Sequence, residues 1–175
     1  MNFARIGMII AHEIMHAFDS TTILTQNDKS SGEAMELDVK KYTSRRDCFI
    51  EQYSGFMWKG YEISTTKTLR ENICDSLGLQ LSYQAYLTDR ENHKNKELAL
   101  PGLQLNHKQI FFLGFAQMWC EKIADGAAKE RIAKDAHSPN MFRVIGAVQN
   151  SPEFADVFHC PLGSPMNPYT KCKIF

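Results

Sequence analysis

The sequence predicts a mainly α-helical domain with little or no β-sheet, and two stretches support this prediction most strongly. In residues 69–86 apolar side chains recur every four positions, which is typical of a helix with one buried face. They are Leu69, Ile73, Leu77, Leu81 and Ala85. In residues 107–123 apolar side chains cover nearly every face of a second helix, so we expect that helix in the core. A length of 175 residues suits one domain, over residues 1–175.

Two further helices are expected before these stretches. Residues 2–18 form the first, which ends near Asp19 and Ser20, and Ala34 to Tyr53 form the second. Residues 20–34 between them are polar and rich in turn-forming residues. They are therefore expected to form a surface loop.

Shorter signals mark the rest of the chain. Residues 61–64 are expected to form an extended piece that leads into the 69–86 helix. The polar stretch 87–106, interrupted by Pro101-Gly102, predicts a connection across the surface. Ser138 and Ser151 each precede a proline, a pattern in which the serine caps a helix and the proline takes its first position. Two short helices are expected to start there.

Charge and hydropathy exclude two classes of partner. The chain has 20 acidic and 20 basic residues, and no basic stripe with interleaved aromatic residues, so nucleic-acid binding is not expected. The basic pairs Lys40-Lys41 and Arg45-Arg46 suit a solvated helix face. The apolar stretch near the start runs only from Ile6 to Ala11, far short of the roughly 20 residues that a bilayer requires. No membrane span and no signal peptide are predicted.

Two histidines stand one helical turn apart in the segment His12-Glu13-Ile14-Met15-His16. Residues four apart project from the same face of a helix, at a separation that lets two imidazoles hold one zinc ion. Glu13 lies about 100° further round the helix, where its carboxylate can reach a water at an open zinc position as a general base. Taken singly, each histidine is better explained as an ordinary core or surface residue. The zinc hypothesis therefore requires a third ligand.

The 69–86 helix offers such a ligand. Catalytic zinc usually has three protein ligands and a water, and Glu71 and Asp75 share one face of this helix. Glu71 is the expected third ligand. Asp75, one turn further on, is expected to accept the second ring N–H of a liganding histidine. The alternative is that both acids lie on a solvated helix edge.

These residues resemble the neprilysin and endothelin-converting-enzyme family of zinc metallopeptidases. In that family a histidine-pair helix is followed by a T-L-x-E-N-I-x-D segment, and residues 68–75 here read T-L-R-E-N-I-C-D. The resemblance continues through segments 103–109, 115–120, 137–143 and 149–152 and covers nearly the whole chain. It implies a thermolysin-like (gluzincin) catalytic subdomain with one zinc ion per chain, held by His12, His16 and Glu71.

The same resemblance implies roles for residues around a bound peptide. His137 is expected to donate to the oxyanion that forms at the cleaved carbonyl, and Asp135 to orient His137. Arg143 is expected to hydrogen-bond the substrate backbone, although by itself it equally suits a surface or carboxylate-paired arginine. A hydrophobic pocket for the side chain on the carboxyl side of the cleaved bond is expected to be lined by Met8, Ile9, Met118 and Trp119.

The implied activity is that of a zinc-dependent endopeptidase, which hydrolyses small peptides on the amino side of bulky apolar residues. Zinc lowers the pKa of its water toward about 7, and Glu13 takes up the proton and later gives it to the leaving amine.

Two alternatives to this activity stay open. One is a catalytically incompetent fragment or non-catalytic relative that acts as a structural or interaction module. The other is a di-iron helix bundle, for which Glu13 and His16 supply one Glu-x-x-His element but the sequence lacks a second.

The sequence contains five cysteines, an odd number without metal-finger spacing, so at least one lies outside any internal disulfide. The resemblance implies a disulfide between Cys48 and Cys172, and partners for Cys120 and Cys160 in an upstream lobe. Cys74 is expected to be a buried thiol that forms no disulfide. The resemblance also implies a secretory-pathway protein, extracellular or at the cell surface.

The resemblance finally implies that this chain is the C-terminal catalytic portion of a longer protein. Family members have a large, mostly helical lobe upstream and, just before the zinc helix, an edge strand that binds peptide backbone. Neither is expected in residues 1–175. The expected partners are therefore peptide substrates and the missing N-terminal lobe.

Overall fold

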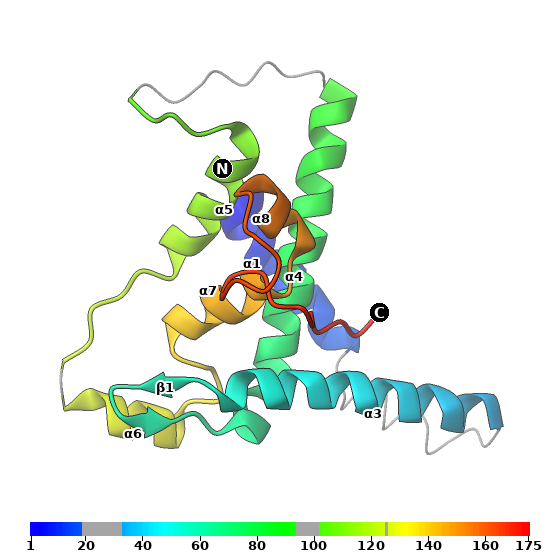
Figure 1. Cartoon of the computed structure of the whole chain (residues 1–175), viewed down its shortest axis with the longest axis vertical. Coiled ribbons are helices and arrows are strands. Elements are labelled where there is room, and N and C mark those ends of the chain that lie inside the picture. Colours follow the sequence, from blue (N-terminus) through cyan, green and yellow to red (C-terminus); the bar gives the residue numbers. More distant parts are fainter. Residues whose placement is uncertain (19–32, 94–101, 125) are drawn as a thin grey trace.

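The computed structural model describes residues 1–18, 33–93, 102–124 and 126–175 (Figure 1). The helical segments at the start are η1 (Phe3–Gly7), α1 (Met8–Met15) and η2 (His16–Phe18), and the later helices and strands follow in chain order. They are α3 (Glu33–Ser54), β1 (Met57–Trp58), β2 (Tyr61–Glu62), α4 (Thr65–His93), α5 (His107–Met118), α6 (Ala127–Lys134), α7 (Asn140–Gln149) and α8 (Pro152–Val157). The prediction of a mainly helical fold with little sheet is confirmed. In the described ranges, the sheet is the antiparallel hairpin of β1 and β2.

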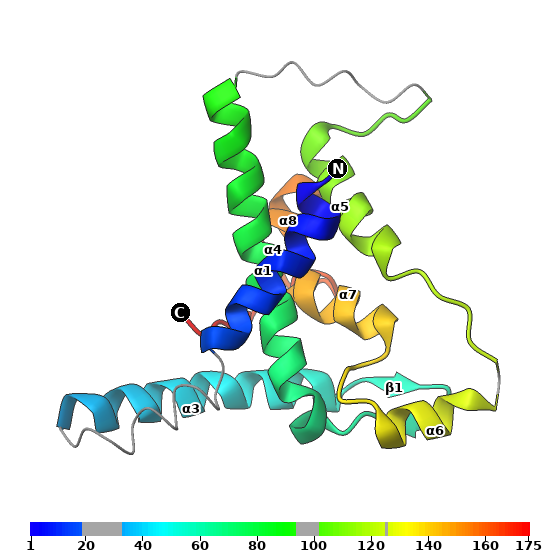
Figure 2. The same cartoon turned by 180° about the vertical axis from the view of Figure 1, so that it is seen from behind.

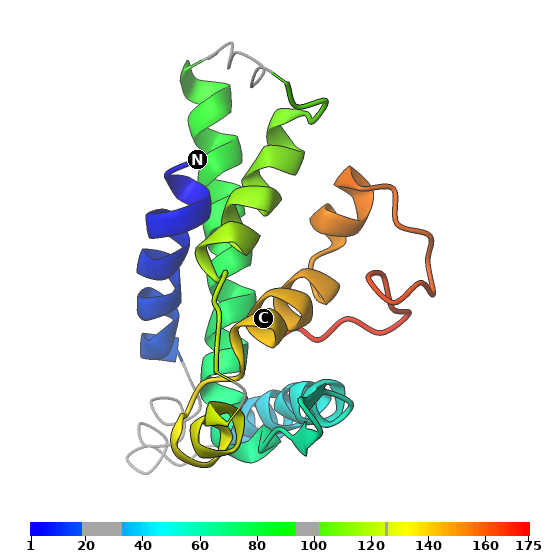
Figure 3. The ribbon, with the colours of Figure 1, turned by 90° about the vertical axis from the view of Figure 1, so that its left-hand side faces the viewer.

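The long helix α4 is the centre of the arrangement. It contacts η1, α1, α3 and α7. Figure 2 shows α1 lying obliquely across α4, while Figure 3 shows α1 and α5 on either side of it and α3 crossing its lower end. None of the described helices is long and apolar enough to span a membrane.

A glycine sets how closely α1 approaches α4. A Cβ atom added at Gly78 would lie only 2.9 Å from both the backbone nitrogen and the Cα of His12, closer than real Cβ contacts allow. Gly78 therefore lets the two helices pack almost backbone to backbone. The contact holds His12 directly against α4.

Two hydrophobic clusters share α4. The first lies between α4, α5 and the helical start of the chain, and its centre is a group of aromatic rings that includes Tyr83, Phe111 and Phe112. The second lies between α3, α4 and α7 and includes Tyr53 and Ile73. Because α4 contributes to both clusters, the position of its polar residues relative to the neighbouring helices is fixed on two sides.

The buried face of α4 differs from the predicted one. Leu81 is 39% exposed and Ala85 is exposed, whereas Leu79 and Tyr83 are buried. A helix turns about 100° per residue, so a strict four-residue recurrence drifts by about 40° at each step. Over residues 69–85 the predicted stripe therefore rotates away from the core.

Several helix boundaries also differ from the predictions. Helix α4 continues to His93, so the first part of the expected 87–106 connection is helical, and α5 ends at Met118 rather than near residue 123. Helix α6 was not predicted. The expected loop at 20–34 lies mostly outside the described residues. Of the extended piece predicted at 61–64, the first two residues form strand β2.

The two Ser-Pro signals have different outcomes. Ser151 accepts a hydrogen bond from the backbone nitrogen of Phe154 at 3.1 Å, and Pro152 is the first residue of α8, as predicted. Ser138 does not cap α7, which begins at Asn140. Its hydroxyl donates instead to Oδ1 of Asn72 at 2.7 Å. A buried side-chain partner on α4 has replaced the local cap.

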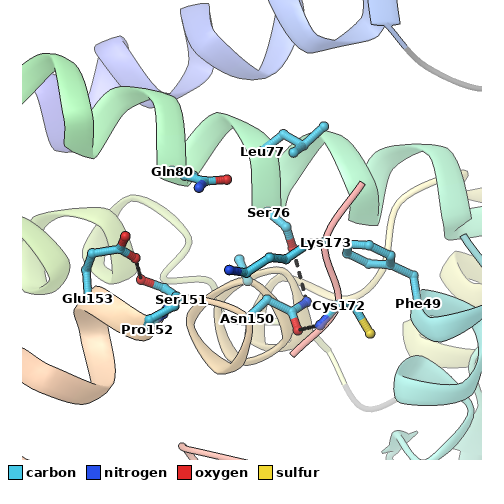
Figure 4. A pocket seen from close by; sticks show the side chains of 11 residues that line it. Phe49, Ser76, Leu77, Gln80, Asn150, Ser151, Pro152, Glu153, Cys172 and Lys173 are labelled. Carbon is cyan, nitrogen blue, oxygen red and sulfur yellow. Dashed lines mark hydrogen bonds between the residues drawn. The ribbon is translucent and has the colours of Figure 1, made fainter. Parts of the chain in front are cut away.

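The C-terminal segment is fastened to α3 and α7. Cys48 and Cys172 form the predicted disulfide. The side chain of Asn150 accepts from the backbone nitrogen of Cys172 at 2.9 Å and donates to Gln52 at 2.8 Å and to Ser76 at 3.4 Å. Figure 4 shows Asn150, Cys172 and Ser76 around a small pocket beside α4. Together the disulfide and the hydrogen bonds of Asn150 hold the C-terminal segment in place.

Candidate active site and metal centre

Helix α1 and the segment η2 that continues it place His12 and His16 side by side. The Nε2 atoms of His12 and His16 lie 3.1 Å apart, and the two rings are almost perpendicular, with an interplanar angle of 86°. From α4, Oε2 of Glu71 lies 3.1 Å from Nε2 of His12 and 3.3 Å from Nε2 of His16. Three donor atoms from two helices thus converge at one point. Among the described His, Cys, Asp and Glu side chains, they form the group that can hold a metal ion.

The spacing of these donors fits zinc. Zinc binds nitrogen and carboxylate oxygen at about 2.0–2.2 Å, and tetrahedral angles then separate two donors by about 3.3–3.5 Å. The three observed separations lie between 3.1 and 3.3 Å. Small side-chain movements would open the group enough to surround an ion. Two neutral imidazoles and one carboxylate are also a common ligand set for catalytic zinc.

Electrostatics favour a cation at this point. Burial by itself lowers the pKa of His12, but the adjacent carboxylates of Asp75 and Glu71 outweigh burial and raise that pKa to about 9. Burial raises the pKa of Glu71, yet the hydrogen bond from His12 and the positive charges of His16 and His137 bring it down to about 2. Without a metal, a proton on His12 supplies positive charge. A metal ion would displace that proton and take its place.

Asp75 connects His12 to Arg143. Its Oδ1 atom lies 2.9 Å from Nδ1 of His12, and both its oxygens accept hydrogen bonds from the Arg143 guanidinium at 2.7 Å. Asp75 is completely buried, and Arg143 is 8% exposed. The guanidinium carbon also lies 3.9 Å from the centre of the Trp119 ring. Arg143 is thus paired with a carboxylate, while its expected hydrogen bond to a substrate backbone stays a prediction.

A second set of contacts brings His137 to the other side of Glu71. Nε2 of His137 lies 3.3 Å from Oε2 of Glu71. Its Nδ1 atom lies 2.8 Å from Oδ1 of Asp135, which also accepts from the backbone nitrogen of His137 at 2.9 Å. Burial raises the pKa of Asp135, but these hydrogen bonds and the charges of His137 and Arg131 lower it overall. Asp135 is therefore ionised at neutral pH and holds the ring.

Asn72, for which no role was predicted, links α4 to the segment that carries His137. Its Nδ2 donates to Thr68 at 3.0 Å, and its Oδ1 accepts from Ser138, the residue after His137. All three are buried. The position of Asn72 next to Glu71 in the T-L-x-E-N-I-x-D segment was the signal that could have pointed to it.

The remaining predicted residues are spread over several environments. Glu13 follows His12 in α1, and its side chain is exposed. Met8 is completely buried in the first cluster, and Ile9, Met118 and Trp119 pack partly buried against it. Trp119 also lines a surface hollow between α5 and α7. Which of these residues contact a substrate stays a prediction.

Comparison with known families identifies the class. The model of Peptidase family M13 matches residues 1–174. An endothelin-converting enzyme homolog of Locusta migratoria is 41% identical over 176 residues, and mouse neprilysin is 40% identical over 182 residues. This chain belongs to peptidase family M13. Both alignments cover the whole of this chain but only 24% of the relative, so the chain spans about a quarter of their length.

Solved structures support the same fold. A galactose-containing glycoprotein complex of Haemonchus superposes with a TM-score of 0.86 at 31% identity, over 99% of this chain and 30% of that one. A zinc metalloprotease of Mycobacterium tuberculosis, solved with an inhibitor, superposes with a TM-score of 0.74 at 29% identity, over 91% of this chain and 25% of that one. The fold and the family thus agree.

Proposed function

We propose that this chain is the zinc-binding catalytic portion of a metalloendopeptidase that hydrolyses small peptides on the amino side of bulky apolar residues. The observation that carries the proposal is the convergence of His12, His16 and Glu71 at separations that suit zinc. Membership of family M13 and the likeness to a zinc metalloprotease support it. We further propose an extracellular or cell-surface location, which the Cys48–Cys172 disulfide favours.

In this proposal each side chain near the metal site has a separate role in peptide hydrolysis. Zinc supplies a water of lowered pKa and a positive charge near the peptide carbonyl. Glu13, exposed beside His12, accepts the proton of the attacking water and returns it to the leaving amine. His137 donates from Nε2 to the oxyanion, while Asp135 fixes its ring. Asp75 fixes His12, and Trp119 with the neighbouring Met118 forms part of the apolar subsite.

A Glu13→Gln variant tests the role of the general base. Glutamine has the same shape but cannot accept the proton, so peptide cleavage should fall by about 10²–10⁴-fold while zinc stays bound. The measurements are zinc content per chain and cleavage of a quenched fluorescent peptide, each with and without a chelator. Exposed Glu62 lies in β2 and provides the control, Glu62→Gln, which should cleave as the parent does. A Glu13→Gln protein that cleaves normally would refute the proposed mechanism.

One observation favours a second candidate function for the isolated chain. Four large apolar side chains, spaced four residues apart along the first helical segments, are each about half exposed or more: Ile6, Ile10, Ile14 and Phe18. A row of this kind suits a surface that another part of a longer protein covers. The chain by itself is then a zinc-binding module without activity. Bound zinc without chelator-sensitive cleavage would favour this second function.

A further inference from the structure

Three histidines lie near Glu71, and the Nδ1 atom of each, which points away from Glu71, contacts a residue of its own. Nδ1 of His12 lies 2.9 Å from an oxygen of Asp75, and Nδ1 of His137 lies 2.8 Å from an oxygen of Asp135. Nδ1 of His16 instead lies 3.3 Å from the sulfur of Cys74. Two histidines therefore face carboxylates, and the third faces a thiol.

We propose that Cys74 is a positioning residue for His16. A histidine that binds metal through Nε2 carries its proton on Nδ1, so the Nδ1–H of His16 donates to Sγ of Cys74. This hydrogen bond selects the tautomer that leaves Nε2 available and restrains rotation of the ring. The inference rests on the proposed zinc site.

The position of Cys74 on α4 supports this role. Cys74 is 0% exposed, and the prediction that it is a buried thiol outside any disulfide is confirmed. It directly precedes Asp75, so two consecutive residues of α4 contact histidines one helical turn apart: Asp75 faces His12 in α1, and Cys74 faces His16 at the start of η2. The close approach of the helices at Gly78 fixes both pairs at once.

The geometry argues against two other roles for this thiol. Cys74 contacts the ring nitrogen of His16 that does not face Glu71, since the Nε2 atom lies 3.3 Å from that carboxylate. The sulfur therefore lies behind the ring and not among the three converging donors. Complete burial also keeps it from reagents in solution.

Sulfur is a weaker hydrogen-bond acceptor than a carboxylate. Cys74 should therefore hold His16 less firmly than Asp75 holds His12. Loss of an outer partner of a metal-binding histidine typically costs 10–100-fold in affinity, and with the weaker acceptor we expect a loss of about threefold to tenfold in zinc affinity for Cys74→Ala. Cys74→Ser retains an acceptor and should recover most of this loss.

The test measures zinc affinity by competition with a chromophoric chelator for the parent chain, Cys74→Ala, Cys74→Ser and the control Cys160→Ala. Cys160 also lies outside the disulfide, and its replacement by alanine should leave the zinc affinity unchanged. Thermal unfolding of each metal-free protein separates weaker zinc binding from a weaker fold. Equal affinity for the parent and Cys74→Ala would overturn the inference while leaving the zinc site intact. A parent chain that binds no zinc would refute the site and the inference together.

A second measurement uses the parent chain, so it tests the inference even if Cys74→Ala does not fold. In the zinc-loaded parent protein, ¹⁵N-NMR of the histidine side chains should show His16 protonated at Nδ1, with slow exchange of that proton. In Cys74→Ser the Nδ1 signal of His16 should shift while that of His12 stays in place. A His16 ring protonated at Nε2, or a rapidly exchanging Nδ1 proton, would contradict the proposed hydrogen bond.

Discussion

Glu71 faces two groups of imidazoles that the fold holds in different ways. On one side, His12 and His16 project from a helix that packs backbone to backbone on α4, and their outer nitrogens face Asp75 and Cys74, both completely buried. On the other side, His137 lies in a connection before α7, with 40% of its side chain exposed, and its outer nitrogen faces Asp135 two residues away.

The contacts that hold His12 and His16 are thus buried and join separate helices, whereas the contact that holds His137 is local and partly exposed to solvent. Breaking the buried contacts should reduce stability and metal affinity together, because buried charges and helix packing depend on each other. Breaking the contact of His137 should reduce catalysis with little effect on folding or zinc binding. Four substitutions test this contrast.

Asp75→Ala should have the largest effect. It leaves the buried guanidinium of Arg143 and the ring of His12 without their shared carboxylate, and an uncompensated buried charge costs about 3–5 kcal/mol in unfolding free energy. Chemical denaturation followed by circular dichroism measures the loss. The double variant Asp75→Leu with Arg143→Met removes both charges and should regain part of it. A loss below about 1 kcal/mol for Asp75→Ala is the value typical of exposed pairs. It would contradict the claim that the buried contacts of Asp75 with Arg143 and His12 stabilise the fold.

His137→Ala should reduce turnover without releasing the metal. Removal of one oxyanion donor typically costs about 10²–10³ in kcat, and His137 is not one of the three converging donors His12, His16 and Glu71. Steady-state kinetics and zinc content on an active form of the protein measure both effects. Loss of zinc from His137→Ala would show that His137, whose Nε2 lies 3.3 Å from Glu71, serves as a ligand instead.

Gly78→Ala tests the helix contact that positions His12. The added methyl group would meet the backbone of α1 at 2.9 Å, and forcing an extra carbon into a packed interface costs about 1–3 kcal/mol. Zinc affinity should fall as well, since α1 has to move away from Glu71. Gly55→Ala is the matched control, because a Cβ there makes only an ordinary contact of 3.7 Å with the carbonyl oxygen of Gln52. Equal stability for Gly78→Ala and Gly55→Ala would show that α1 and α4 do not pack tightly at Gly78.

Asp135→Asn should have the smallest effect on folding. The carboxylate and the His137 ring are 31% and 40% exposed, and a pair of this kind contributes about 0–1 kcal/mol. Because folding lowers the pKa of Asp135, its stabilisation is present above the unfolded pKa of about 3.9 and is lost as the pH falls through the folded value. Unfolding measured from pH 7 downward should show the variant and the parent converging in acid. A gap that widens toward low pH would contradict this sign. Asp156→Asn, at an exposed position, is the control.

The sequence by itself specified those features that depend on local spacing. Histidines four apart and carboxylates four apart each share a helix face, because the helical repeat is close to four residues, so spacing alone predicts the His12–His16 and Glu71–Asp75 pairs. Ser151 before Pro152 also sufficed for the start of α8. The family resemblance added the distant pair Cys48–Cys172, which no periodicity specifies.

Tertiary packing decided the rest. Ser138 carries the same local signal as Ser151 but donates to Asn72 on α4, and the four-residue apolar recurrence did not predict that Leu81 would be exposed. The partner of each outer ring nitrogen, Asp75 for His12 and Cys74 for His16, follows from the close approach of α1 at Gly78. Local sequence fixes which residues share a face, but only long-range contacts decide what that face meets, because the free energy of burial depends on the neighbour as well as on the residue.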